Sequence, residues 1–186
     1  MCSGIRDASN LSWKIAYCLK KNHSDKLLST YQSERYSNVK EYIKTTAKMG
    51  EFVNAVGTSN ITGKVSSTPD GQKSMKSIKP KLGKGLGEVQ DKNRGKIFPQ
   101  FKIRNGKSLD DKFSLKPILI LSKEIKNNIS SKLNSIQSKN NKDLEKFFKS
   151  SNSKAIIVRP DRFILSSCKS VKEFKSYLKK NLSVLV

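Results

Sequence analysis

The sequence has few of the residues that build metal and disulfide sites. Its 186 residues include three cysteines and one histidine. Cys2, Cys18 and Cys168 show no Cys-x-x-Cys spacing, and His23 is the only histidine, so zinc binding, dithiol chemistry and Cys–His catalysis are not expected. No apolar run approaches the length of a membrane span and no signal peptide is found, so we expect a cytoplasmic protein without a membrane partner.

Acidic residues are also scarce, at 15 against 38 Lys and Arg, which gives a formal net charge of +23. Such a charge is typical of nucleic-acid-binding proteins. The basic residues are nevertheless spread through every segment, and Lys far outnumbers Arg, the residue that suits bidentate phosphate contacts. We therefore expect no specific nucleic-acid partner. Phe147 and Phe148 next to Lys146 and Lys149 could stack on RNA, but their helical spacing favours core packing.

The first residues have the pattern of a helix whose N-terminus approaches a ligand closely. A small opening at residues 2–4 leads into an amphipathic segment that ends near Leu19. The unpaired N–H groups of a first helical turn, together with the positive end of the helix dipole, favour a negatively charged ligand. The alternative from periodicity alone is an ordinary packing helix that buries Leu11, Ile15 and Leu19.

This segment resembles the second flavin motif of the FAD-dependent aromatic-ring hydroxylases, the family of para-hydroxybenzoate and phenol hydroxylases. The matching residues are Gly4, Ile5, Asp7, Ala8, Asn10, Leu11, Trp13, Lys14 and Ala16. Two later segments agree with the resemblance, namely Leu27-Leu-Ser-Thr-Tyr-Gln-Ser-Glu-Arg35 and Ala155-Ile-Ile-Val-Arg-Pro-Asp-Arg-Phe163. The second is similar to a signature of the branch with a thioredoxin-like tail, and the order of segments is most similar to the 3-(3-hydroxyphenyl)propionate hydroxylase-like members.

The resemblance implies which residues would contact the cofactor FAD. The backbone amides of Met1 and Cys2 would lie beside the N1/O2 edge of the isoalloxazine, where reduced flavin gathers negative charge. Ser3 and Gly4 would complete the first turn, with Gly4 allowing close approach, and Asp7 would support the turn. The family's substrate-facing groups would lie upstream of these residues, so no catalytic residue is assigned.

One feature of the family is absent. The dinucleotide fingerprint Gly-x-Gly-x-x-Gly, which holds the FAD pyrophosphate, does not occur. The nearest string, Gly83-Lys-Gly-Leu-Gly87, has a different spacing and is expected to be a loop. The expected function is therefore that of the C-terminal portion of a monooxygenase that hydroxylates a phenolic substrate with FAD, NAD(P)H and O2, inactive as an isolated chain.

Several alternatives stay open at this point. The chain could come from a truncated gene, have a misassigned start, or be completed by an N-terminal FAD and substrate domain in cis or in trans. A homodimer is also compatible with the sequence. A different class of function is a non-catalytic basic module that binds a protein or polyanion partner, and the net charge is the feature that supports it.

We expect an α/β fold in three parts. Residues 1–56 would be N-terminal helices left over from a flavin-binding domain, and residues 57–96, rich in Gly, Ser, Lys and Pro, a flexible basic linker. Residues 97–186 would form a thioredoxin-like domain without a redox dithiol. The second helix, at 27–56, would bury one apolar face made of Leu28, Tyr31, Val39, Tyr42, Ile43 and Phe52.

Within the tail, the pattern predicts alternating strands and helices. Strands are expected at 116–122, 154–158 and 163–167, with a turn at Pro160 and a further edge strand at 98–103. Helices are expected through Ile125, Ile129, Leu133 and Ile136, around Leu144 to Phe148, and from Val171 onward.

Overall fold

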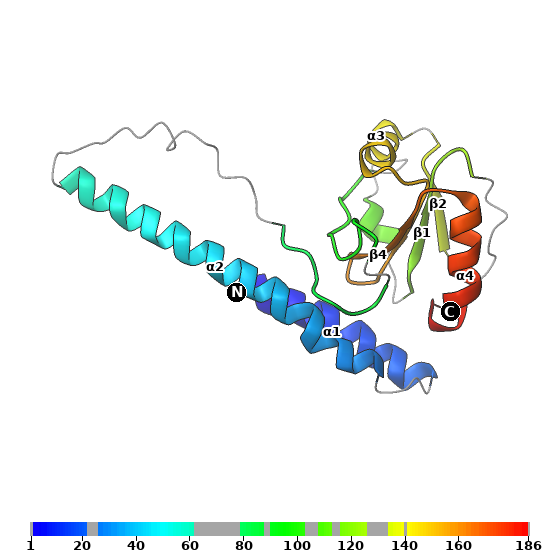
Figure 1. The fold of residues 1–186 in the computed structure, drawn as a ribbon, viewed down its shortest axis with the longest axis horizontal. Helices are drawn as coiled ribbons and strands as arrows, with labels where there is room; N and C mark the ends of the chain where they lie inside the picture. The colour runs from blue at the N-terminus through cyan, green and yellow to red at the C-terminus, as the bar shows by residue number, and fades with distance from the viewer. Residues whose placement is uncertain are drawn as a thin grey trace.

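The computed structural model describes residues 2–21, 26–61, 79–87, 90–102, 108–112, 116–125, 134–139 and 141–185. Over these residues the chain is a mixed α/β protein, in which a helical hairpin is followed by a four-stranded sheet with a helix on each face (Figure 1). A short 3-10 helix, Leu109–Lys112, precedes the sheet. None of the helices in these ranges is both long enough and apolar enough to span a membrane.

The hairpin consists of α1 (Cys2–Lys21) and α2 (Lys26–Ile61), which lie side by side, with α2 extending well beyond α1 (Figure 1). Its small apolar core is formed by Trp13, Tyr17 and Leu27. The rings of Trp13 and Tyr17 meet edge to face, with their centroids 5.6 Å apart. Because Leu27 lies at the start of α2, these three residues anchor only the first part of that helix.

The buried faces of both helices differ from the apolar stripes expected from the sequence. On α1, Leu19 is 80% exposed, and on α2, Ile43 is 65% exposed. The Phe52 side chain lies outside what the structure describes. Besides the apolar core residues named above, the two helices bury five polar or charged side chains, which are Asn10, Lys14, Glu34, Arg35 and Asn38. The predicted apolar face of α2 is met in part, because Leu28, Tyr31, Val39 and Tyr42 are half-buried while Ile43 is exposed. The buried polar groups satisfy one another, which periodicity does not reveal.

The sheet has the strand order β2-β1-β3-β4. Its strands are β1 (Ile118–Leu121), β2 (Asn134–Gln137), β3 (Ala155–Val158) and β4 (Ile164–Cys168). Strands β1 and β2 are parallel, β3 is antiparallel to β1, and β4 is antiparallel to β3. The connection between the antiparallel strands β3 and β4 is made by the turn at residues 159–162, where Arg162 N–H donates to the Arg159 carbonyl at 2.9 Å.

Alternate residues of the strands pack against opposite helices because successive side chains of a strand point to opposite faces. Ile118 and Ile120 pack with α3 (Lys142–Ser151), whereas Leu119 and Leu121 pack with α4 (Val171–Leu185). Helix α3 begins where the side chain of Asn141 accepts the N–H of Leu144. All four strand residues are buried, as expected for a central strand.

Most tail elements lie close to their expected places, and two do not. The helix expected through Ile136 is wrong at that end, because Ile136 lies in β2 and pairs with Ile120. Residues 126–133 lie outside the described residues. In place of the edge strand expected at 98–103, the described residues 98–102 form one bridge, between Lys102 and Ser108, and a second bridge joins the preceding Ile97 to Phe163.

Part of the expected linker packs against both the hairpin and the sheet. Leu82 is buried, and Gly83 N–H donates to the Glu34 carbonyl of α2 at 2.8 Å. A Cβ at Gly83 would meet the Ser33 carbonyl oxygen, and one at Gly85 would meet the Glu34 side chain. These two glycines let the loop approach α2 closely. The loop then continues to β4, where Gly95 N–H donates to Ile164 at 2.9 Å.

Candidate functional site

The start of α1 is open on the side of its glycine. Helix α1 begins at Cys2, whereas Met1 lies outside the described residues. Ser3 is half-buried, Gly4 is exposed, and a Cβ added to Gly4 would meet no atom within 4 Å. An accessible first turn with free N–H groups is what a flat anionic ring system would need, so the described residues of this helix end fit FAD.

Arg35 of α2 holds this helix end in place. Its Nε donates to Asp7 Oδ1 at 2.6 Å, its Nη2 to Ser3 Oγ at 3.5 Å, and its Nη1 to Asn38 Oδ1 at 2.5 Å. Asp7 lies beyond the first turn, which contains no acidic residue. Asp7 therefore supports the helix end through an ion pair with Arg35 and not through the dipole of the first turn.

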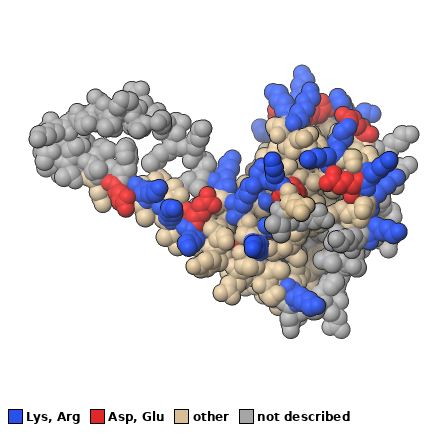
Figure 2. All heavy atoms as spheres, viewed as in Figure 1, with Lys and Arg blue, Asp and Glu red and all other residues tan. Residues whose placement is uncertain are grey.

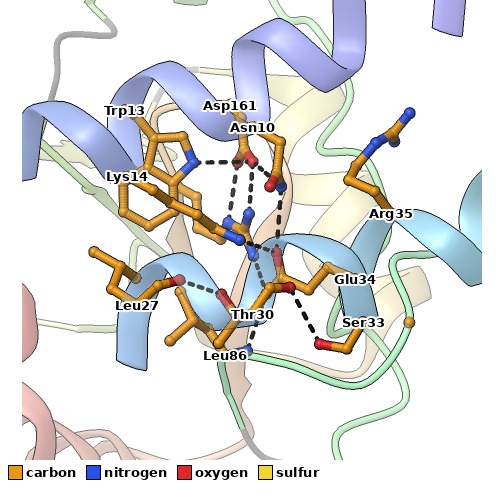
Figure 3. Close-up of polar contacts among 12 residues, drawn as sticks. Asn10, Trp13, Lys14, Leu27, Thr30, Ser33, Glu34, Arg35, Leu86 and Asp161 are labelled. Carbon is orange, nitrogen blue, oxygen red and sulfur yellow. Dashed lines mark hydrogen bonds and ion pairs between the residues drawn. The ribbon is translucent and has the colours of Figure 1, made fainter. Parts of the chain in front are cut away.

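A second group of polar residues lies deeper, where α1, α2 and the turn after β3 meet (Figure 3). We call Lys14, Glu34, Arg159 and Asp161 the charged cluster. Lys14 Nζ lies 2.9 Å from Glu34 Oε2, Arg159 Nη1 lies 2.8 Å from Glu34 Oε1, and Arg159 Nη2 lies 2.6 Å from Asp161 Oδ2. The four side chains are at most 2% exposed, and their formal charges sum to zero.

Neutral donors complete the charged cluster. Asn10 Nδ2 donates to Glu34 at 3.2 Å and to Asp161 at 2.9 Å, and Trp13 Nε1 donates to Asp161 at 3.1 Å. The guanidinium carbon of Arg159 lies 5.1 Å from the centre of the Trp13 ring, within cation–π range. The loop at residues 82–87, which contains Gly83 and Gly85, is called the glycine loop; its Leu86 backbone N–H donates to Glu34 Oε1 at 3.0 Å. Helices α1 and α2, the glycine loop and the turn after β3 are thus joined at one point.

The ion pairs determine the protonation of the cluster. Burial by itself would raise the pKa of the Glu34 carboxyl, but Arg159 and Lys14 lower it to about 2. Burial lowers the pKa of Lys14, an effect that Glu34 partly offsets. Burial would also lower the pKa of Arg159, but Asp161 and Glu34 reverse this and raise it. We therefore treat Glu34 and Arg159 as ionised at neutral pH.

The charged cluster was not predicted, although its residues belong to the segments that carry the family resemblance. Asn10, Trp13 and Lys14 come from the first segment, Glu34 from the second, and Arg159 and Asp161 from the third. The available signal was Lys14, which interrupts the apolar positions of α1, and the acidic Glu34 in the middle of α2. Neither says which partner it meets, because Glu34 and Arg159 are 125 residues apart in sequence.

The chemistry of the cluster is that of a structural tie. Both carboxylates and both cations are paired, so no group is left to act as a general base. Among the described residues there is also no group of three or more His, Cys, Asp or Glu side chains that could hold a metal ion. The cluster can fix the orientation of α1, and with it the position of the open helix end.

Comparisons with known proteins match the hairpin region to a flavin-binding domain. Residues 1–46 match a family model described as "FAD binding domain". The chain is 35% identical over 104 residues to a probable NADH-specific resorcinol 4-hydroxylase of Rhodococcus jostii (strain RHA1), which covers 54% of this chain and 19% of that protein. It is 45% identical over 50 residues to a 3-(3-hydroxy-phenyl)propionate/3-hydroxycinnamic acid hydroxylase of Paraburkholderia xenovorans (strain LB400), covering 27% and 8%.

The fold is also found in solved structures. The rebeccamycin biosynthetic enzyme RebC with reduced flavin has a TM-score of 0.62 at 16% identity, covering 99% of this chain and 41% of RebC. OxyS anhydrotetracycline hydroxylase from Streptomyces rimosus has a TM-score of 0.61 at 17% identity, covering 95% and 40%.

Helix α1 and the first part of α2 lie within the stretch that matches the FAD binding domain. Over parts of its length the chain is similar to FAD-dependent aromatic-ring hydroxylases, and its fold is also found in solved hydroxylases. It spans about a fifth of the length of the resorcinol hydroxylase that it matches and about two fifths of the solved structures. The resemblance read from the sequence is thereby confirmed.

Proposed function

We propose that this chain is the C-terminal portion of a flavin-dependent monooxygenase that hydroxylates a phenolic or other aromatic substrate. The observation that carries the proposal is the open first turn of α1, with Gly4 facing empty space and Arg35 holding Ser3 and Asp7. The matched relatives, whose names are those of aromatic hydroxylases, support the same reaction class.

The residues of this chain would act by binding and positioning. The first-turn N–H groups of Cys2, Ser3 and Gly4, together with the backbone of Met1, would face the negatively charged edge of the cofactor. Arg35 and the charged cluster would keep α1 from rotating or sliding. Bound FAD, with NADH or NADPH and O2, would supply the hydroxylation chemistry, and the name of the resorcinol hydroxylase favours NADH.

The division of labour within the chain is part of the proposal. Residues 1–56 would belong to the flavin-binding part, and residues 97–186 would be a thioredoxin-like tail. Residues 57–96 would be the linker between these two parts, in a cytoplasmic protein. The strand order β2-β1-β3-β4, with one parallel and two antiparallel pairs, supports a thioredoxin-like arrangement. Cys18 lies on α1 and Cys168 on β4, so the two do not support a dithiol function for the tail.

The test is a flavin titration of the purified chain and of a complemented mixture. FAD binding is measured by quenching of the flavin fluorescence. We expect no saturable binding by the chain alone, because the residues that would hold the pyrophosphate are not in its sequence. Adding a separately produced N-terminal polypeptide from the Paraburkholderia xenovorans hydroxylase should restore binding. That polypeptide titrated alone is the control.

Saturable micromolar FAD binding by the isolated chain would contradict the claim that it is incomplete as a flavin site. No restored binding in the mixture, together with steeply salt-dependent binding of the chain to a polyanion such as heparin, would favour a basic interaction module instead.

A further inference from the structure

The tail has a hollow at the end of the sheet that lies away from the charged cluster. The turn at residues 159–162 holds Arg159 and Asp161 at one end of β3 and β4, whereas Ala155 and Cys168 pair with each other at the opposite end. There a hollow of about 690 Å³ lies between the loop at residues 90–96, the end of α3 and the start of α4. We call it the tail pocket. Its volume is in the range of about 300 to 1,000 Å³ that small-molecule sites have.

Three lysines of the tail pocket have no carboxylate partner among the described residues. Lys96 Nζ donates to the neutral Asn93 Oδ1 at 2.9 Å. Lys92 and Lys169 are bonded through their backbones alone within the described ranges, and both side chains are exposed. On the face drawn in Figure 2, Lys and Arg likewise gather over the part of the molecule that contains the sheet. The tail pocket therefore presents three ammonium groups to an anion.

The two carboxylates of the tail pocket are already engaged in holding its walls. Asp91 Oδ2 accepts the N–H of Ser167 at 2.5 Å, and its Oδ1 accepts the Ser167 hydroxyl at 2.7 Å and the Asn93 N–H at 2.8 Å. Glu173 Oε2 accepts the N–H of Lys169 at 2.7 Å. These bonds fix the loop and the start of α4 relative to β4, so the lysines extend from a preformed frame.

A smaller hollow of about 200 Å³ adjoins the tail pocket, because Asn152 and Lys169 line both. Lys149 lines the smaller hollow, and its ammonium group has no acceptor within the described part of the chain. The remaining lysines there are paired with carboxylates, Lys123 with Glu145 and Lys154 with Glu124. The excess of positive charge thus continues beyond the tail pocket.

The lining of the tail pocket fits phosphate better than it fits other anions. Lysine binds phosphate oxygens as a point charge, whereas a planar carboxylate is held best by the fork of an arginine. No arginine is among the described residues that line the tail pocket. Five serines and two asparagines of the lining add neutral donors.

We propose that the tail pocket binds a small organic molecule through its phosphate groups. The three lysines would neutralise the phosphate charges, and the remaining volume, with Cys168 and Tyr177 in its wall, would take the organic part. The inference concerns the tail alone and does not depend on the proposed flavin function.

The experiment measures the binding of inorganic pyrophosphate and of ADP to the full chain by isothermal titration calorimetry. An ionic strength of about 0.15 M screens loose attraction to the basic surface. The test variant combines Lys92→Gln with Lys169→Gln and so removes two ammonium groups from the tail pocket. The matched control combines Lys142→Gln with Lys146→Gln, at exposed positions of α3 outside both linings.

The two double variants have the same net charge, and circular dichroism and the melting temperature check that each stays folded. Lys92→Gln alone provides a second test that leaves α4 untouched.

We expect one saturable site in the natural chain, with ADP bound more tightly than pyrophosphate. Binding should weaken at least about tenfold in the test variant and less than about twofold in the control. Equal weakening in both variants would show attraction by net charge alone and overturn the site. Absence of saturable binding of both probes would also overturn it. Tighter binding of pyrophosphate than of ADP would overturn the organic occupant.

Discussion

Arg159 lies at the centre of the contacts that join the two parts of this molecule. It donates to Glu34 with one nitrogen and to Asp161 with two, and it stacks over Trp13. A buried ion pair adds little net stability over an apolar pair, but removal of one partner leaves the other charge buried and unpaired. The cluster should therefore be sensitive to changes of a single atom.

Replacement of Glu34 by Gln should lower the free energy of unfolding at neutral pH by about 3 to 5 kcal/mol, because Lys14 and Arg159 both lose their shared carboxylate. Urea unfolding followed by circular dichroism measures the change. Glu41→Gln, at an exposed position of the same helix, is the control and should have little effect.

The pH dependence of the same variants separates charge from packing. The pKa of Glu34 is lowered from 4.5 to about 2 by folding, so between these values the unfolded chain binds more protons and stability falls as the pH falls. Titration of Glu34 should lower the free energy of unfolding of the natural chain by about 3 kcal/mol across this window. Glu34→Gln lacks the titrating group, so its free energy of unfolding should not include this loss. Parallel acid profiles for the two proteins would argue that Glu34 acts through its shape alone.

Helix α2 has two halves with different surroundings. Between Leu27 and Val39 it contacts α1 and the glycine loop, whereas from Lys44 to Glu51 all described side chains are exposed except the partly buried Thr45. A helix gains most of its stability from packing of one face. The two halves should therefore differ in how often their hydrogen bonds open.

Amide hydrogen exchange tests this difference. We expect the amides of residues 30–39 to exchange much more slowly than those of residues 46–51, because the first group opens only when the packing around Glu34 is lost. The amides of α4 around Phe174, which is fully buried, provide an internal reference for strong protection. Equal protection along the whole of α2 would mean that the far half is also covered in solution.

The elements also show what the sequence could and could not predict. The apolar run of β1 and the turn at Pro160 were found because a short buried strand and a turn leave local signals. Ile136 is predicted to lie in a helix because its spacing of three residues from Leu133 fits the helical period. The polar interior of the hairpin was missed because Lys14 is buried only by virtue of Glu34 and Arg159, and such long-range pairing has no local pattern.

For the whole molecule, the charged cluster links the hairpin to the sheet across most of the chain. Trp13 and Asp161 are 148 residues apart in sequence, yet they share a buried hydrogen bond. The glycine loop adds a second connection, since it bonds to Glu34 at one end and to β4 at the other. The hairpin and the sheet should therefore unfold together.

The single tryptophan makes this cooperativity measurable. In the natural chain, thermal unfolding followed by Trp13 fluorescence should coincide with that followed by circular dichroism. Asp161→Asn weakens the bonds to Trp13, Asn10 and Arg159. In this variant the melting temperature followed by Trp13 fluorescence should therefore lie several degrees below that followed by circular dichroism. Asp143→Asn on the exposed side of α3 is the control. Coincident transitions in Asp161→Asn would show that the cluster does not couple the two parts.

The loop that ends at β4 also protects the sheet against association. Gly95, Lys96 and Phe98 take up hydrogen bonds along the outer side of the 162–164 region, and the Asp91 carboxylate accepts the N–H of Ser167 farther along. An uncovered edge strand is a template for pairing with another chain. A shortened protein that starts at residue 97 would expose this edge of the sheet and tend to aggregate. A truncated protein that contains the tail should therefore start before residue 79.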